Sequence, residues 1–75
     1  MKYQDFITAD HRVMLGKPVL KGTRLTVELI LRKLGEGAGV NDLIQMYPDL
    51  RPESIQAVLQ YAAEVIANQE NLETV

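Results

Sequence analysis

Residues 26–47 read TVELILRKLGEGAGVNDLIQMY, and this stretch carries two amphipathic helical patterns separated by a glycine-rich loop. Apolar residues spaced i, i+3, i+4 and i+7 form one face of an α-helix, and that spacing occurs here twice. The first set is Val27, Ile30, Leu31 and Leu34. The second set is Val40, Leu43, Ile44 and Tyr47. The stretch therefore predicts two consecutive helices, each with one apolar face for a common core.

Capping residues mark the ends of these two helices. Thr26 is a suitable N-cap for the first, and Gly35 follows it where a left-handed residue commonly ends a helix. Gly39 is the expected N-cap of the second helix, and Asp42 lies near its positive end. Pro48 then ends the second helix, because the residue before a proline disfavours the helical conformation.

A third helix is predicted to begin at Pro52 and to end near Asn68. Proline suits the first helical turn, where its missing N–H has no partner to lose. Its apolar face comprises Ile55, Val58, Leu59, Ala62 and Ile66, with Val65 at the edge. Its opposite face comprises Glu53, Gln56, Ala57, Gln60 and Glu64. Three helices, of which the second is short, give the outline of a helix-turn-helix unit.

The first 25 residues predict a short β-hairpin. Residues 3–8 are rich in aromatic and β-branched types, which favour strands, and Gly and Pro separate the short apolar runs between residues 13 and 22. The predicted fold class is therefore mainly α, with three helices and an N-terminal β-hairpin. Within one domain, we expect a hairpin arm over residues 1–25, a three-helix core over residues 26–68 and a frayed acidic tail over residues 69–75.

Composition limits the class of protein. The chain has 75 residues, of which 47% are hydrophobic and 24% are charged, as in an ordinary globular domain. It has no cysteine, which argues against disulfides and thiolate metal sites. Because neither a membrane span nor a signal peptide is visible, we expect a cytoplasmic protein. Small domains without disulfides often oligomerise to gain buried area, so we expect a homodimer.

The residues that could perform catalysis are isolated from one another. His11 lies in a predicted turn, and Ser54 lies in the first turn of the third helix without an obvious base. The carboxylates are scattered singly, so no pair for acid–base chemistry is visible. We therefore expect no catalytic residues, no cofactor and no metal, and we expect that the protein is not an enzyme.

The net charge of −2 hides an asymmetry between the two halves of the chain. Residues 1–33 carry seven basic and three acidic groups, for a net charge of +4. Residues 34–75 carry one basic and seven acidic groups, for a net charge of −6. A polyanion would therefore prefer the first half, and a basic partner would prefer the second.

The third helix offers mixed signals for DNA binding. Gln56 and Gln60 have side chains suited to adenine edges. Glu53 and Glu64 on the same face would repel phosphates, and Arg51 is the one basic residue nearby. If DNA is bound, most phosphate contacts must come from basic residues of the N-terminal half, and the candidates are Lys17, Lys21 and Arg24.

These three candidates are interleaved with Gly16, Pro18 and Gly22, and glycine lets a backbone approach a ligand closely. A nucleotide-cradling loop is one interpretation, but the Walker spacing is missing. The second interpretation is a structural turn whose charged side chains are solvated. The third interpretation is a contact for nucleic acid or for a partner protein.

Residues 16–24 contain Gly-Lys-Pro-x-x-Lys-Gly-Thr-Arg, and this string resembles the family catalogued as domain of unknown function four-three-three. The similarity extends to Tyr47-Pro48 and Pro52-Glu53-x-Ile55 and covers roughly residues 5–66. It implies a homeodomain-like helix-turn-helix with an N-terminal β-hairpin. Members are often proposed to be antitoxins encoded beside PIN-type nuclease toxins. The candidate motif residues that carry over are Gly16, Lys17, Pro18, Lys21, Gly22, Thr23 and Arg24.

The chain departs from the family pattern before Pro52, where Arg51 replaces the usual Ser or Thr. Losing that cap costs about 1 kcal/mol, and a positive charge is unfavourable at the positive end of a helix. We therefore expect Arg51 to contact a phosphate. Thr26 in place of a proline and Gly39 in place of Ser or Thr change little, because both can cap a helix.

Two main functions are consistent with these patterns. The first is an antitoxin-like DNA-binding protein that represses its own toxin–antitoxin operon as a dimer, with third helices about 34 Å apart in successive major grooves. The alternative is a protein-interaction module that masks a nuclease-type toxin without binding DNA, with its acidic half facing a basic surface. A third possible function is that of a structural module without a role in nucleic-acid binding.

Overall fold

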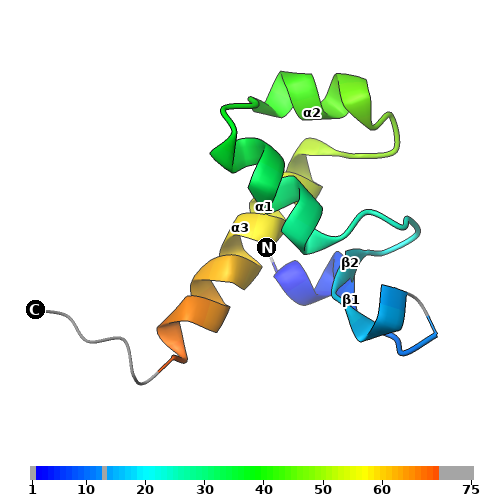
Figure 1. Cartoon of the computed structure of the whole chain (residues 1–75), viewed down its shortest axis with the longest axis vertical. Coiled ribbons are helices and arrows are strands. Elements are labelled where there is room, and N and C mark those ends of the chain that lie inside the picture. Colours follow the sequence, from blue (N-terminus) through cyan, green and yellow to red (C-terminus); the bar gives the residue numbers. More distant parts are fainter. Residues whose placement is uncertain (1, 13, 70–75) are drawn as a thin grey trace, which may run out of the picture.

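Three helices and a two-stranded antiparallel hairpin form the structure, a computed structural model that describes residues 2–12 and 14–69 (Figure 1). The helices are α1 (Val27–Gly35), α2 (Val40–Met46) and α3 (Pro52–Ala67). The strands are β1 (Ile7–Thr8) and β2 (Val19–Leu20), and the 3₁₀ turns are η1 (Tyr3–Asp5) and η2 (Met14–Gly16). The predicted fold class is confirmed. Of the predicted tail, residues 70–75 lie outside the described residues.

The N-terminal hairpin is shorter than the sequence predicted. Residues 3–5 form η1 instead of the first half of a strand, with the N–H of Phe6 donating to the carbonyl of Tyr3 at 2.9 Å. The ring of Tyr3 meets the ring of Tyr61 on α3 edge-on, with 5.6 Å between centroids. Packing against α3 therefore overrides the strand propensity of these residues.

Local capping explains where α1 begins and ends. Thr26 caps it as predicted, because its Oγ1 accepts the N–H of Leu29 at 3.0 Å. The prediction for its end was wrong, because Gly35 still belongs to the helix and Gly37 is the left-handed residue, with φ of 104°. The N–H groups of Gly37 and Ala38 donate to carbonyls of the last turn, each at 3.0 Å, which is the Schellman arrangement.

The starts of α2 and α3 agree with the sequence. Gly39 is the N-cap of α2, and its N–H donates to Asp42 Oδ2 at 2.7 Å. Pro52 is the first residue of α3, and Arg51 is its N-cap. Arg51 makes no side-chain capping hydrogen bond, so the start of α3 lacks the stabilisation that Thr26 gives α1.

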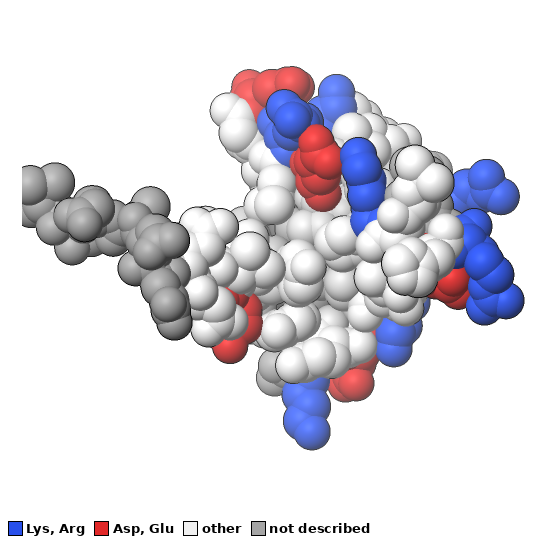
Figure 2. Space-filling model, turned by 60° about the horizontal axis from the view of Figure 1, so that its bottom comes forward, with Lys and Arg blue, Asp and Glu red and all other residues white. Residues whose placement is uncertain are grey.

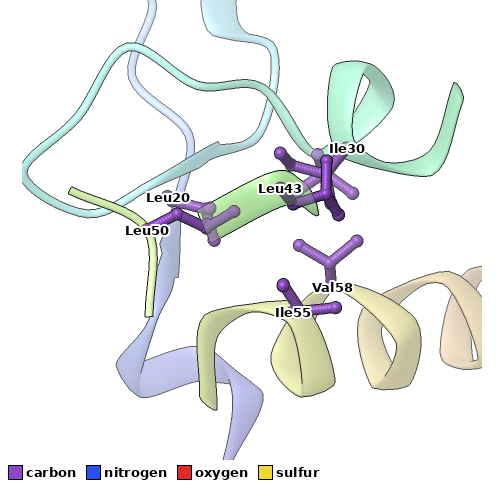
Figure 3. Packing of buried hydrophobic residues seen from close by; sticks show 7 residues of the cluster. Leu20, Ile30, Leu43, Leu50, Ile55 and Val58 are labelled. Atoms are coloured by element: carbon purple, nitrogen blue, oxygen red, sulfur yellow. The ribbon is translucent and has the colours of Figure 1, made fainter. Parts of the chain in front are cut away.

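One hydrophobic core joins the three helices, β2 and the α2–α3 connection. Figure 3 shows Ile30, Leu43 and Val58 pointing toward one another, with Leu20 beside Leu50. Because Leu20 of β2 belongs to this core, the hairpin is fixed to the helices. The buried members of the core are Leu20, Val27, Ile30, Leu43, Leu50, Ile55 and Val58.

The second half of α3 lacks the burial that the sequence predicted. Ile55 and Val58 lie in the core, but Leu59 and Ile66 are 50% and 55% exposed, and Val65 is exposed as well. In Figure 1 this half of α3 projects away from the other helices. This part of its apolar face is exposed because no element among residues 2–12 and 14–69 packs over it.

The prediction for Ala57 was wrong in the opposite direction, because this residue is buried and was expected to be exposed. The sequence places it on the exposed face of α3, whereas the structure buries it completely. It lies one helical turn before Tyr61, and η1 packs along α3, with Tyr3 on Tyr61. Periodicity within α3 could not reveal that the N-terminal segment covers this side.

Candidate nucleic-acid interface

The turn over residues 21–24, between β2 and α1, has a well-defined backbone. Thr23 Oγ1 donates to the carbonyl of Leu20 at 2.8 Å and accepts the N–H of Leu25 at 3.0 Å. The N–H of Leu20 also donates to the carbonyl of Leu25 at 2.9 Å. Gly22 has a φ of 78°, a left-handed conformation that favours glycine. This turn is therefore a defined support for the side chains that it carries.

The turn presents Lys21 and Arg24 to solvent, and neither forms an ion pair with any described carboxylate. Lys21 borders a hollow of about 180 Å³ that it shares with Arg51 and Ser54 at the start of α3. Arg24 borders a second hollow with Asp49 of the α2–α3 connection. Asp49 borders both hollows. The structure thus brings Lys21, Arg24 and Arg51 into one region.

Two neighbours hold Arg51 at the start of α3. Its Nη2 lies 2.9 Å from the carboxylate of Glu53, and its guanidinium lies 6.0 Å from the centroid of the Phe6 ring. The hydrogen bond from Arg51 lowers the pKa of Glu53 below its ordinary value of 4.5. Because this ion pair is exposed, it contributes little and can be exchanged for another anion. Asp5 and Asp49 also border the hollow, so its charge is mixed.

Lys17 lies against α1 instead of at the start of α3. Its Nζ is 3.4 Å from Glu28 of α1, and the same carboxylate is 3.0 Å from Arg32. The hydrogen bonds from Arg32 and then from Lys17 lower the pKa of Glu28. The structure therefore does not group Lys17 with Lys21 and Arg24, although the three are close in sequence.

Gln56 and Gln60 are both exposed on α3. Gln60 borders a hollow that it shares with Tyr3 and Glu64, so the N-terminal segment and a negative charge lie beside it. Gln56 is one turn closer to the start of α3, where the basic residues lie. Of the two glutamines, Gln56 has the more favourable surroundings for a contact with DNA.

Gly16 and Pro18 of the motif have structural roles. Gly16 has a φ of 82°, and a Cβ there would lie 3.4 Å from His11 Nδ1. The carbonyl of Pro18 accepts the N–H of Val27 at 3.0 Å, which ties the hairpin to the start of α1. Just before them, Leu15 has a φ of 57° and is 91% exposed. Leu15 was not predicted as a site residue, since no sequence pattern marks a single exposed apolar residue in a loop.

The basic side chains do not form one continuous patch. On the face shown in Figure 2, Lys and Arg are spread apart, and several of them lie beside an acidic side chain. Arg12 pairs with Asp10 at 3.0 Å and lowers the pKa of that carboxyl through its hydrogen bonds, and Lys33 pairs with Glu36 at 3.8 Å. In the described part of the chain, the basic residues outside ion pairs are Lys2, Lys21 and Arg24.

Metal and membrane sites can be assessed within the same residues. Among residues 2–12 and 14–69, no three His, Asp or Glu side chains gather closely enough to hold a metal ion. No helix in these ranges is long and apolar enough to cross a membrane. The region around Lys21, Arg24 and Arg51 is the candidate site because it brings exposed basic residues together.

Comparison with known proteins connects this region to a family. The family model described as "Protein of unknown function (DUF433)" matches residues 7–62 of the chain. The match spans β1, the turn over residues 21–24 and the first two thirds of α3. No curated protein and no solved structure matches the chain.

Proposed function

The chain belongs to the DUF433 family, and we propose that it is an antitoxin-like, DNA-binding helix-turn-helix protein that represses its own operon. One observation carries the proposal: two exposed basic residues outside the described ion pairs lie near the segment that leads into α3. Lys21 shares a hollow with Arg51 and Ser54 at the start of α3, and Arg24 borders a hollow with Asp49 just before it. In a helix-turn-helix the first residues of the recognition helix approach the bases, so charges beside them meet the phosphates.

The proposed contacts differ between these basic residues. Lys21 and Arg24 bind phosphates directly, because neither forms an ion pair with a described carboxylate, although Asp49 borders both hollows. Arg51 exchanges the carboxylate of Glu53 for a phosphate, and this exchange costs little because the ion pair is exposed. Gln56 reads a base edge from the first half of α3, with adenine as the best match.

The repressor role requires two copies on a palindromic site and a partner toxin. A homodimer would present two α3 helices about 34 Å apart, one helical turn of DNA. The family resemblance supports an antitoxin whose partner is a nuclease of the PIN type. In such a system, DNA binding by the antitoxin controls the synthesis of both proteins.

Fluorescence anisotropy with DNA from upstream of the protein's own gene tests the proposal. We expect selective binding over a scrambled duplex, with affinity that falls steeply as salt rises. The double variant Lys21→Ala/Arg24→Ala should bind at least about tenfold more weakly. Its salt dependence should flatten by about two units of slope, since each lost phosphate contact removes about 0.9.

A matched control removes the same charge elsewhere. The double variant Arg12→Ala/Lys33→Ala breaks two ion pairs outside the candidate site and should bind like the parent. If both double variants lose affinity equally, net charge alone explains binding and the assigned site is wrong. If no duplex binds selectively at low salt, the repressor role is wrong.

A second function is favoured by Leu15. Leu15 is 91% exposed and held at a positive φ, and strained backbone of this kind clusters at binding sites, so we propose that it inserts into an apolar pocket of a protein partner. In this alternative, the chain masks a nuclease-type toxin without binding DNA. The variant Leu15→Ser should then weaken binding to the nuclease encoded beside the gene, while Lys21→Ala/Arg24→Ala should not. The opposite result would reject this function.

A further inference from the structure

The projecting half of α3 carries an uncovered apolar stripe. Leu59, Ala62, Ala63 and Ile66 have the i, i+3, i+4, i+7 spacing, so they lie on one face of the helix. Leu59 is 50% exposed and Ile66 is 55% exposed, and Ala63 is exposed as well.

This stripe contains no charge. The charged residues of α3 are Glu53 and Glu64. At 3.6 residues per turn, Glu64 points roughly 150° away from the centre of the stripe. The surface can therefore be buried without bringing a carboxylate out of water, which a protein interface must avoid.

The order of residues in the stripe is symmetrical. It reads large, small, small, large from Leu59 to Ile66, and it reads the same in the reverse direction. A twofold interface needs a surface that is complementary to itself, because residue i contacts residue j of the second copy and the reverse also holds. We propose that this stripe is where a second copy of the chain binds, through antiparallel packing of α3 on α3.

The register follows from the symmetry. With the twofold axis between Ala62 and Ala63, Leu59 faces Ile66 of the second copy. The alanines meet at the crossing point and let the helices approach closely.

The area available predicts a weak dimer. The stripe consists of two half-exposed large side chains and two alanines, so each copy offers only an ordinary apolar patch of a few hundred Å². Two such patches would bury less than the ~1,200–2,000 Å² of a stable interface. We therefore expect association at high micromolar concentration, strengthened when both copies occupy one DNA site.

The same register sets the distance between the two DNA-contacting regions. Pro52 lies 10.5 residues from the axis, at about 1.5 Å of rise per residue, so the two α3 starts would be about 32 Å apart. Half-sites read by helix-turn-helix dimers lie about 34 Å apart. This last step rests on the proposed function, whereas the self-association itself does not.

Sedimentation equilibrium without DNA tests the interface. The parent protein should rise from 8.4 kDa toward twice that mass as concentration increases. Ile66→Glu should raise the dimer dissociation constant at least about tenfold, because it places two carboxylates in the buried contact. The matched control Gln60→Glu adds the same charge beside the stripe and should leave the mass profile close to that of the parent.

Cysteine cross-linking tests the register, since the chain has no cysteine of its own. A mixture of Leu59→Cys and Ile66→Cys variants should oxidise mainly to the mixed dimer, and neither variant alone should cross-link efficiently, because both positions lie within α3 and face each other in this register. A parent that stays monomeric at millimolar concentration, or an Ile66→Glu variant that dimerises normally, would overturn the proposal. A dimer that forms without the mixed cross-link would overturn the register. Neither result depends on DNA.

Discussion

The two halves of α3 have opposite surroundings, although the second half is the more apolar of the two. Residues 52–58 pack into the core and begin at the hollow that Lys21 borders. Residues 59–67 project into solvent with Leu59 and Ile66 half exposed. The comparison teaches that periodicity fixes a helix and its apolar face, while the elements that reach the helix decide whether that face is buried.

The largest expected effect on stability comes from replacing an isoleucine by alanine in each half of α3. Ile55→Ala should cost about 2–5 kcal/mol of unfolding free energy, because Ile55 is 2% exposed and its loss leaves a cavity. Ile66→Ala should cost less than about 1 kcal/mol, because Ile66 is already in water. Urea denaturation at low protein concentration measures both.

A milder pair keeps this test usable if Ile55→Ala does not fold. Ile55→Val should cost about 0.5–1.5 kcal/mol, and Ile66→Val should be close to neutral. Equal losses at the two positions would mean that the second half of α3 is buried, and the contrast between the halves would disappear.

A second test removes the contact at the boundary between the halves. Tyr3→Ala should destabilise the protein by about 2 kcal/mol, because it deletes a half-buried ring and its edge-on contact with Tyr61. Amide hydrogen exchange should then speed up around Ala57, which η1 covers. The control Tyr3→Phe keeps the ring and should change stability little. Unchanged exchange in Tyr3→Ala would show that η1 does not protect α3.

Much of the fold was predictable because its signals are local. Thr26, Gly39 and Pro52 mark helix starts through their own hydrogen bonds or fixed φ, and each prediction is confirmed. The strand predicted over residues 3–8 was wrong in its first half, where the structure has η1. Local sequence could not reveal this, because Tyr3 packs against Tyr61, which is distant in the chain. The burial of Ala57 escaped prediction for the same reason.

The candidate site was predictable residue by residue but not in its grouping. Lys17, Lys21 and Arg24 are equivalent in sequence, yet only Lys17 has a carboxylate partner, Glu28 of α1. Arg51 drew attention as an unusual cap, and the structure places it near Lys21 at one hollow. These contacts form only when α1, the turn over residues 21–24 and α3 pack together. They could not be predicted from local sequence, because the residues involved are distant in the chain.

A third test separates stability from DNA binding at the start of α3. Arg51→Ser should stabilise the free protein by about 0.5–1 kcal/mol, because a serine N-cap outweighs an exposed ion pair and a distant ring contact. The same variant should weaken DNA binding severalfold. Thermal unfolding and anisotropy measure the two effects. A variant that binds DNA as tightly as the parent would remove Arg51 from the interface.

The smallest effect concerns pH and compares the glutamates of the two halves. Folding lowers the pKa of Glu53 from its ordinary value of 4.5 through the hydrogen bond from Arg51. The charged form therefore stabilises the folded state. This contribution is complete above pH 4.5 and is lost as the pH falls through the lowered pKa.

Glu53→Gln should be slightly less stable than the parent at pH 7, and its stability should approach that of the parent in acid. Glu64→Gln removes the same charge where no ion pair exists among the described residues, so it is the control for the loss of charge alone. Thermal unfolding of all three proteins between pH 3 and pH 7 would show whether the start of α3 alone carries this dependence.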